Sequence, residues 1–140
     1  MNEYKGECLC GACCYVITGQ KPKAMYLYHC SRCRKETGTI HGATVFFNDA
    51  KLLWKKGKDN IAYFKLENTR KQRAFCETCG SPLPRQDGEC SVILPAGTLD
   101  DSAFLEPTAH IFYASRVWWE DKLIDLKRFD ELPKVDQYCL

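Results

Sequence analysis

The alternation of apolar and polar positions predicts a chain made mostly of short β-strands. After Gly11, residues 13, 15 and 17 (Cys, Tyr, Ile) alternate with 14, 16 and 18 (Cys, Val, Thr). A period of two is typical of a strand with one buried face. Other segments rich in β-branched and aromatic residues predict further strands at 24–30, 41–48, 51–54, 61–66, 73–75, 90–94 and 109–114.

Glycine, proline and polar clusters separate these segments. They predict turns at 19–23 and 55–60 and a tight knuckle at 76–80. Residues 81–85 contain Pro82 and Pro84, so this stretch is expected only at the edge of a sheet. Little helix is expected: a short helical turn at 31–38, with Ser31 as N-cap and Gly38 as its end, and a weakly helical stretch at 123–132.

Length and composition favour one globular domain. The chain has 140 residues, of which 45% are hydrophobic and 27% charged, so we expect a single domain over 1–140 with its core at about 4–133. We expect no membrane span, since no apolar run approaches the roughly 18 residues required. The first residues contain no apolar signal region, so a cytoplasmic location is expected. A formal charge of +2 gives no reason to expect a nucleic-acid partner.

Ten cysteines change this picture, because ordinary domains of this size carry far fewer. In a reducing compartment, Cys-x-Cys and Cys-x-x-Cys spacings favour a metal site over disulfides. Cys8 and Cys10 lie two apart and can point to the same side of an extended chain, while Cys76 and Cys79 flank a turn that ends at Gly80. Together they predict a closed four-thiolate site for structural zinc, with iron as an open alternative.

Such an ion would close a long loop between the two pairs, so its loss is expected to unfold the chain. The alternatives are four independent buried thiols, or a labile disulfide between Cys76 and Cys79.

The cysteine motifs also resemble a known family. Gly6-Glu7-Cys8-Leu9-Cys10-Gly11, His29-Cys30-Ser31-Arg32-Cys33-Arg34-Lys35 with Thr37-Gly38, and Phe75-Cys76-Glu77-Thr78-Cys79-Gly80-Ser81 are similar to motifs of the glutathione-dependent formaldehyde-activating enzymes and the related centromere-protein-V-like domains. His110-Ile111 and Trp118-Trp119 extend the resemblance over nearly the whole chain. It implies a mainly β fold of the β-tent type, with several short antiparallel strands packed as small sheets.

The resemblance also implies a second, catalytic zinc, with Cys30 and Cys33 as two of its ligands. A third cysteine of the family motif is replaced here by Tyr28. A neutral phenol is a poor ligand, since its ordinary pKa is about 10. His29, His41 and Cys13 are other candidates for the missing ligand, although His29 should point away from Cys30 on a regular strand.

The implied activity is that of a carbon–sulfur lyase resembling S-(hydroxymethyl)glutathione synthase. Zinc would bind a thiol such as glutathione and lower its pKa, and the thiolate would add to formaldehyde or another small aldehyde, or the reverse. Cys30 and Cys33 would carry the catalysis. Arg34 and Lys35 could bind the carboxylates of the thiol substrate, or could form a solvated basic turn.

Two alternatives remain open. One is a non-catalytic zinc-stabilised domain that binds a protein through exposed aromatic residues, its second metal site having degenerated at Tyr28. The other is a thiol or redox enzyme, such as a relative of methionine sulfoxide reductase, with Cys13 or Cys90 as nucleophile. Cys13 and His110 are expected in the core, and Cys14, Cys90 and Cys139, which have no partner in any motif, are expected to be free thiols.

Overall fold

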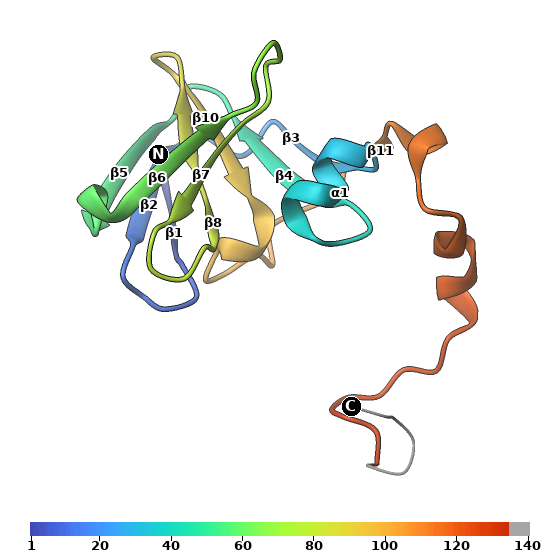
Figure 1. Cartoon of the computed structure of the whole chain (residues 1–140). Coiled ribbons are helices and arrows are strands. Elements are labelled where there is room, and N and C mark those ends of the chain that lie inside the picture. Colours follow the sequence, from blue (N-terminus) through green and yellow to red (C-terminus); the bar gives the residue numbers. More distant parts are fainter. Residues whose placement is uncertain (135–140) are drawn as a thin grey trace.

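The computed structural model describes residues 1–134 and contains three small β-sheets (Figure 1). The first has the order β1-β2-β5, the second β11-β3-β4-β10-β9 and the third β6-β7-β8. The strand bounds are β1 (Asn2–Glu7), β2 (Cys14–Gly19), β3 (Ala24–Tyr28), β4 (Gly42–Phe47), β5 (Lys51–Lys56), β6 (Ile61–Lys65), β7 (Gln72–Cys76), β8 (Pro82–Leu83), β9 (Arg85–Asp87), β10 (Ser91–Pro95) and β11 (Ala109–Ile111).

Helix is scarce. The α-helix α1 (Ser31–Thr37) follows β3, and the 3₁₀ turns are η1 (Lys58–Asn60), η2 (Ala96–Thr98), η3 (Tyr113–Ser115) and η4 (Trp118–Asp125). Gly38 ends α1 in a left-handed conformation, with φ of 68°, as predicted. The N-cap is Cys30 and not the predicted Ser31, since the Cys30 side chain accepts the N–H of Cys33. A mainly β fold of small sheets is confirmed.

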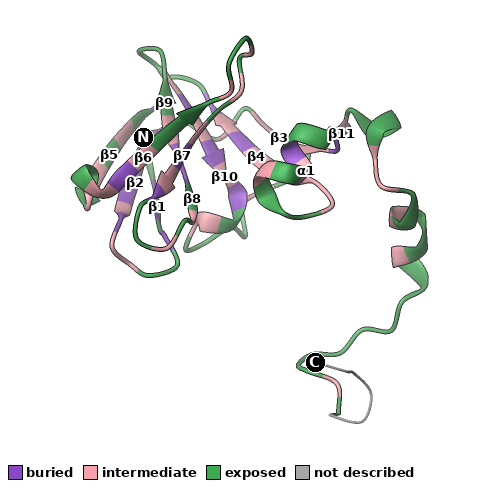
Figure 2. Ribbon diagram, in the orientation of Figure 1, coloured by how far each residue is buried: buried purple, intermediate pink, exposed green. Residues whose placement is uncertain are grey.

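The main core lies between the first two sheets. Its largest fully buried side chains are Tyr15 and Ile17 of β2, Phe47 of β4 and Leu94 of β10, and Figure 2 shows the buried residues concentrated in these strands. Tyr15 and Ile17 are two of the alternating positions that predicted this strand. A second cluster is built around Cys8, Cys13, Ile61, Ala74, Cys76 and Leu83. One cysteine of each predicted pair, Cys8 and Cys76, therefore lies in this second core, with Cys79 packed against it and Cys10 exposed.

Several predicted boundaries need correction. The structure adds β1, which pairs with β2 over its whole length although its polar residues face solvent. The strand predicted at 109–114 ends at Ile111, because Phe112 adopts a left-handed φ of 53°. β11 also pairs with β3 in parallel, an exception among otherwise antiparallel pairs. The prediction of a helix at 123–132 is correct only as far as Asp125, where the 3₁₀ turn η4 ends, and is wrong for 126–132.

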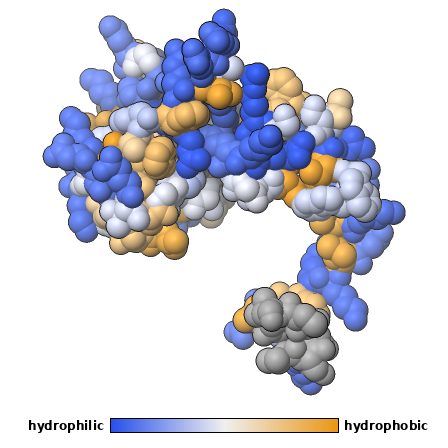
Figure 3. Space-filling view, viewed as in Figure 1, coloured by the Kyte–Doolittle hydropathy of each residue, from blue (hydrophilic) through white to orange (hydrophobic). Residues whose placement is uncertain are grey.

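The segment after β11 leaves the body of the molecule (Figure 1, orange to red). It carries many exposed apolar side chains, among them Trp118, Ile124 and Leu132, each more than three-quarters exposed at 78%, 76% and 79%. Figure 3 shows hydrophobic patches along this segment. Among residues 1–134 the structure has no helix with the length and apolar character to cross a bilayer.

Candidate metal centre and adjoining cleft

The first cysteine pair sits in the loop of the β1–β2 hairpin. This loop is closed by two backbone hydrogen bonds, from the Cys8 N–H to the Cys13 carbonyl and from the Gly11 N–H to the Cys8 carbonyl, both 3.0 Å. Gly11 has a φ of +70°, a conformation that residues with a side chain rarely adopt. The glycine thus lets the chain reverse directly after Cys10.

The second pair lies in the β7–β8 turn. The Gly80 N–H donates to the carbonyl of Cys76 at 2.8 Å, and the Cys76 N–H donates to the carbonyl of Ser81 at 2.9 Å. Gly80 has a φ of +72°, as the predicted knuckle requires. Its position after Cys79 fixes the turn that carries both thiols.

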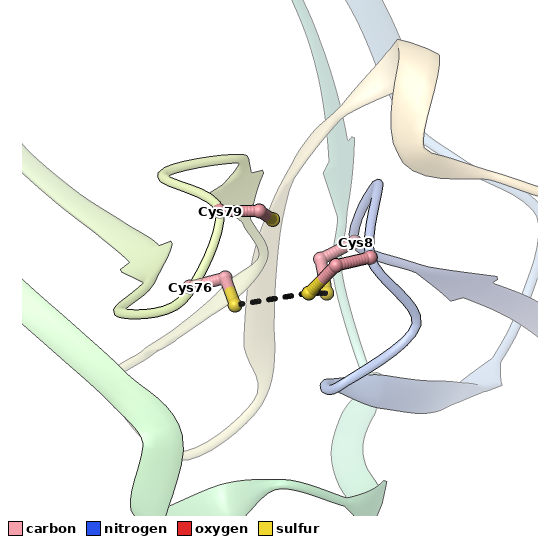
Figure 4. Close-up of side chains that lie close together, drawn as sticks. Cys8, Cys76 and Cys79 are labelled. Carbon is pink, nitrogen blue, oxygen red and sulfur yellow. Dashed lines mark hydrogen bonds between the residues drawn. The ribbon is translucent and has the colours of Figure 1, made fainter.

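The four thiols converge, as predicted. One ligand atom from each of Cys8, Cys10, Cys76 and Cys79 lies within 4.8 Å of all the others, and Figure 4 shows the sulfur atoms of the labelled cysteines turned toward one another from two separate loops. The sulfur of Cys10 is 3.7 Å from that of Cys8 and 3.9 Å from that of Cys76. A tetrahedron with Zn–S bonds of about 2.3 Å has edges of about 3.8 Å. The group can therefore hold a metal ion, and its donors and spacing fit zinc.

Hydrogen-bond donors surround these sulfurs. The Cys13 N–H donates to the sulfur of Cys8, and the amide of Asn60 donates to that of Cys76, both at 3.3 Å. The hydroxyl of Ser81 lies 3.2 Å from the sulfur of Cys79. Together with the Ser81 backbone N–H, it lowers the pKa of Cys79 to about 6. Donors of this kind stabilise thiolates, the form that binds metal.

Cys30 and Cys33 lie elsewhere, in a cleft of about 920 Å³ between the second and third sheets. The cleft is also lined by Tyr28, whose pKa is raised by burial. Burial raises the pKa of Cys33 to about 11, with the neighbouring Cys30 thiol adding to the shift and Lys71 opposing it. The ammonium of Lys71 is 3.7 Å from the sulfur of Cys33 and forms an ion pair with Glu36.

This cleft provides two soft donors and does not complete a zinc site. Within residues 1–134, no third histidine, cysteine or carboxylate joins Cys30 and Cys33 in a potential ligand group. His29 points away from the cleft, as its place on the strand predicted, and His41 is its neighbour, with ring centroids 5.1 Å apart. Cys13 is fully buried beside Cys8. None of the suggested substitutes therefore supplies the missing ligand, and the role of Cys13 as a core thiol is confirmed.

The walls of the cleft are strongly cationic. Six basic side chains line it against two acidic ones, Glu36 and Asp87; the basic residues are Arg32, Lys65, Arg70, Lys71, Arg73 and Arg85. Asp87 is paired with Arg85 at 2.9 Å. The excess of positive charge suits a small molecule with more than one carboxylate.

The predicted substrate-binding residues lie outside this cleft. Arg34 and Lys35 line a separate pocket of about 510 Å³ together with Trp119. The Arg34 guanidinium donates to the carbonyls of His29 and Ser115, at 3.3 and 3.4 Å. It thereby ties α1 to the segment that follows β11.

His110 is exposed, so the prediction of a core histidine is wrong. Its Nδ1 lies 2.7 Å from Nε2 of the fully buried His29. The sequence reasoning also missed Lys71 and Glu120, which are single charged residues in polar stretches with no motif around them. Cys14 and Cys90 are free thiols, as predicted, and no cysteine within residues 1–134 forms a disulfide. Cys139, the third thiol predicted to be free, lies outside the described residues.

Comparisons with known proteins agree with this architecture. A family model described as "Glutathione-dependent formaldehyde-activating enzyme" matches residues 3–115. A crystal structure of a Rhodobacter sphaeroides protein, solved as a structural genomics target, is similar with a TM-score of 0.57; it is 19% identical and the match covers 76% of this chain and 98% of that one. At this identity the likeness concerns the fold alone. No curated protein matches the chain.

Proposed function

The chain belongs to the glutathione-dependent formaldehyde-activating enzyme family, and from this membership we propose that it is a carbon–sulfur lyase that joins a small thiol to a small aldehyde. The observation that carries the proposal is the cleft that holds Cys30 and Cys33 of the family motif within a cationic wall. A thiol such as glutathione has two carboxylates, and the six basic side chains, of which Lys71 and Arg85 are paired with the two acidic ones, leave an excess of positive charge to bind them. The cytoplasm, where such thiols are abundant and cysteines stay reduced, is the proposed location.

We assign the roles as follows. Zinc on Cys8, Cys10, Cys76 and Cys79 is structural, because four protein ligands leave no open position. Cys30 and Cys33 are the proposed catalytic residues. They are also the proposed ligands of a second zinc, which would have only two protein donors and would exchange readily. When bound there, zinc would supply a Lewis acid that lowers the pKa of a substrate thiol.

The reaction forms one carbon–sulfur bond. The substrate thiol loses its proton, its sulfur attacks the carbonyl carbon, and the carbonyl oxygen takes up a proton to give a hemithioacetal. The Lys71 ammonium, already 3.7 Å from the Cys33 sulfur, favours the anionic form of sulfur in this part of the cleft. Tyr28 stays protonated because burial raises its pKa, so its phenol can donate a hydrogen bond to the oxygen on which charge develops.

The basic side chains that line the cleft would position the substrate. Arg70 and Arg73 line the cleft near Lys71, and we propose that they bind substrate carboxylates. The same role stays a prediction for Arg34 and Lys35, which line the neighbouring pocket. An Arg70→Gln variant should raise KM for glutathione, whereas Arg34→Gln should do so only if the thiol extends into that second pocket.

The test compares formaldehyde consumption with glutathione in wild type, Cys30→Ser and Cys33→Ser. Cys90→Ser is the matched control, because Cys90 is an exposed thiol outside the cleft. We expect the two cleft variants to lose activity and the control to keep it. Wild-type rates in Cys30→Ser, or a wild-type rate equal to that without protein, would end the proposal.

A second candidate function is a non-catalytic domain that binds a protein partner. The observation that favours it is the exposed apolar surface of the C-terminal segment, where Trp118 is 78% and Ile124 76% exposed. An inactive wild type with one zinc per chain, in which Trp118→Ser reduces capture of a partner, would support this candidate over the lyase.

A further inference from the structure

A second group of potential metal ligands lies on the other side of β3 from the cleft. It consists of His29, His110 and Glu120, and one ligand atom of each lies within 4.8 Å of the other two. His29 precedes α1, His110 belongs to β11, which pairs with β3, and Glu120 belongs to η4 in the segment that leaves the body (Figure 1). Residues from three separate elements thus meet at one point.

Buried polar atoms without partners mark this point. The His29 side chain is fully buried, and its Nδ1 has no hydrogen-bond partner within residues 1–134; the same is true of Oε2 of Glu120. These two atoms face each other at 3.0 Å, so that a single proton or a single metal ion between them would satisfy both. His41 adds another such atom, its Nδ1, from a ring whose centroid is 5.1 Å from that of His29.

Such atoms are costly unless something satisfies them. An unpartnered buried polar group costs about 1–3 kcal/mol, and native structures hold few of them. The imidazole nitrogen of His29 and the carboxylate oxygen of Glu120, which lie within one potential ligand group with His110, point to a bound cation as their shared partner. Two histidines and one carboxylate are a ligand set that zinc, cobalt and ferrous iron all accept.

The distances require little adjustment. Nδ1 of His29 and Oε2 of Glu120 are 3.0 Å apart, whereas ligands at about 2.05 Å from a tetrahedral ion are separated by about 3.3 Å. The exposed His110 can move, and on binding it would exchange its hydrogen bond with His29, 2.7 Å long, for a bond to the ion, while each neutral ring keeps one N–H.

We propose that His29, His110 and Glu120 form a divalent transition-metal site, separate from both the four cysteines and the cleft. Its ligands are nitrogen and oxygen, and the exposed His110 gives solvent access. The ion would join the C-terminal segment to β11 and to the start of α1, fixing the position of the segment.

The experiment uses the full chain with zinc on the four cysteines, to which cobalt(II) is added. We expect one cobalt per chain that gives no thiolate-to-cobalt charge-transfer absorption and shows paramagnetically shifted histidine ring N–H signals, in addition to any cobalt that Cys30 and Cys33 bind with such absorption. Glu120→Gln and His110→Asn should each weaken cobalt binding at least tenfold. Glu106→Gln, a change at an exposed glutamate outside the group, should leave the affinity unchanged.

Three outcomes would overturn the proposal. The first is wild-type protein that binds no further cobalt, a result that needs no variant to fold. The second is equal affinity in wild type, Glu120→Gln and His110→Asn, which would leave the three residues as a hydrogen-bonded chain. The third is that all of the added cobalt shows thiolate absorption and is lost in Cys30→Ser, which would place the ion in the cleft.

Discussion

Removal of the ion from the four cysteines should unfold the chain. The pairs are far apart in sequence, 66 positions between Cys10 and Cys76. A cross-link over a loop of this length lowers the entropy of the unfolded chain enough to stabilise the fold by about 4 kcal/mol at room temperature. Domains of this size have a total stability of about 5–15 kcal/mol. The cross-link alone is therefore a large part of the whole.

The ion contributes more than a cross-link, because its bonds also form only in the folded chain. Structural zinc in small domains binds with an apparent free energy of about 10–16 kcal/mol. The second core cluster also depends on it, since Cys8 and Cys76 are both members. Without the ion, four thiolate-forming groups would lie within 4.8 Å of one another with no cation between them.

The assay is denaturant unfolding, followed by circular dichroism, of zinc-loaded protein with and without a strong chelator. We expect the free energy of unfolding to fall by at least 4 kcal/mol on chelation, with most of the chain unfolded. Cys76→Ser should behave like the chelated protein, and Cys90→Ser should stay within about 0.5 kcal/mol of wild type. The reasoning is refuted if zinc-free protein unfolds at the same denaturant concentration as zinc-loaded protein.

Three further predictions concern single side chains. Gly57→Ala should lower the free energy of unfolding by about 2–4 kcal/mol, since a Cβ there would lie 2.1 Å from the Ala12 carbonyl oxygen at a φ of +72°. Gly88 has a similar φ of +68° with no atom within 4 Å of its Cβ position, so Gly88→Ala should lower it by only about 1 kcal/mol. Equal losses of stability for the two variants in urea unfolding would argue against the close contact. Burial raises the pKa of Tyr15 above that of the unfolded chain, which is about 10. The stabilisation that follows from this shift is complete below pH about 10 and is lost as the pH rises further. Tyr15→Phe should therefore lose less stability than wild type between neutral pH and pH about 11, and identical pH profiles of the free energy of unfolding would contradict the assignment. Lys71→Met should raise KM for glutathione severalfold in a steady-state assay, because it removes a cation from the cleft, and an unchanged KM would exclude Lys71 from substrate binding.

Local patterns predicted the strands with one buried face and the first metal site. Tyr15 and Ile17 are buried in β2 between the half-buried Cys14 and Thr18, although Val16 is buried as well. Each cysteine pair sits in a turn with a glycine in the left-handed conformation, so local chemistry was sufficient to predict it. β1 was missed because it pairs through its backbone while its side chains are mostly polar and exposed. No pattern in the sequence shows that β11 pairs in parallel with β3, since that contact depends on the whole intervening chain.

The end of β3 explains why neighbouring residues belong to different sites. Tyr28 and Cys30 face the cleft, whereas His29 between them faces His110 and Glu120, as alternation along an extended chain requires. A residue placed at 28 therefore points toward Cys30 and Cys33, and one at 29 cannot. Tyr28→Cys should accordingly add a third thiolate to the cleft and a second tightly bound zinc, while leaving cobalt binding at His110 and Glu120 unchanged. If Tyr28→Cys bound no additional zinc, the three positions would not converge and the cleft could not be the degenerate counterpart of a three-cysteine site.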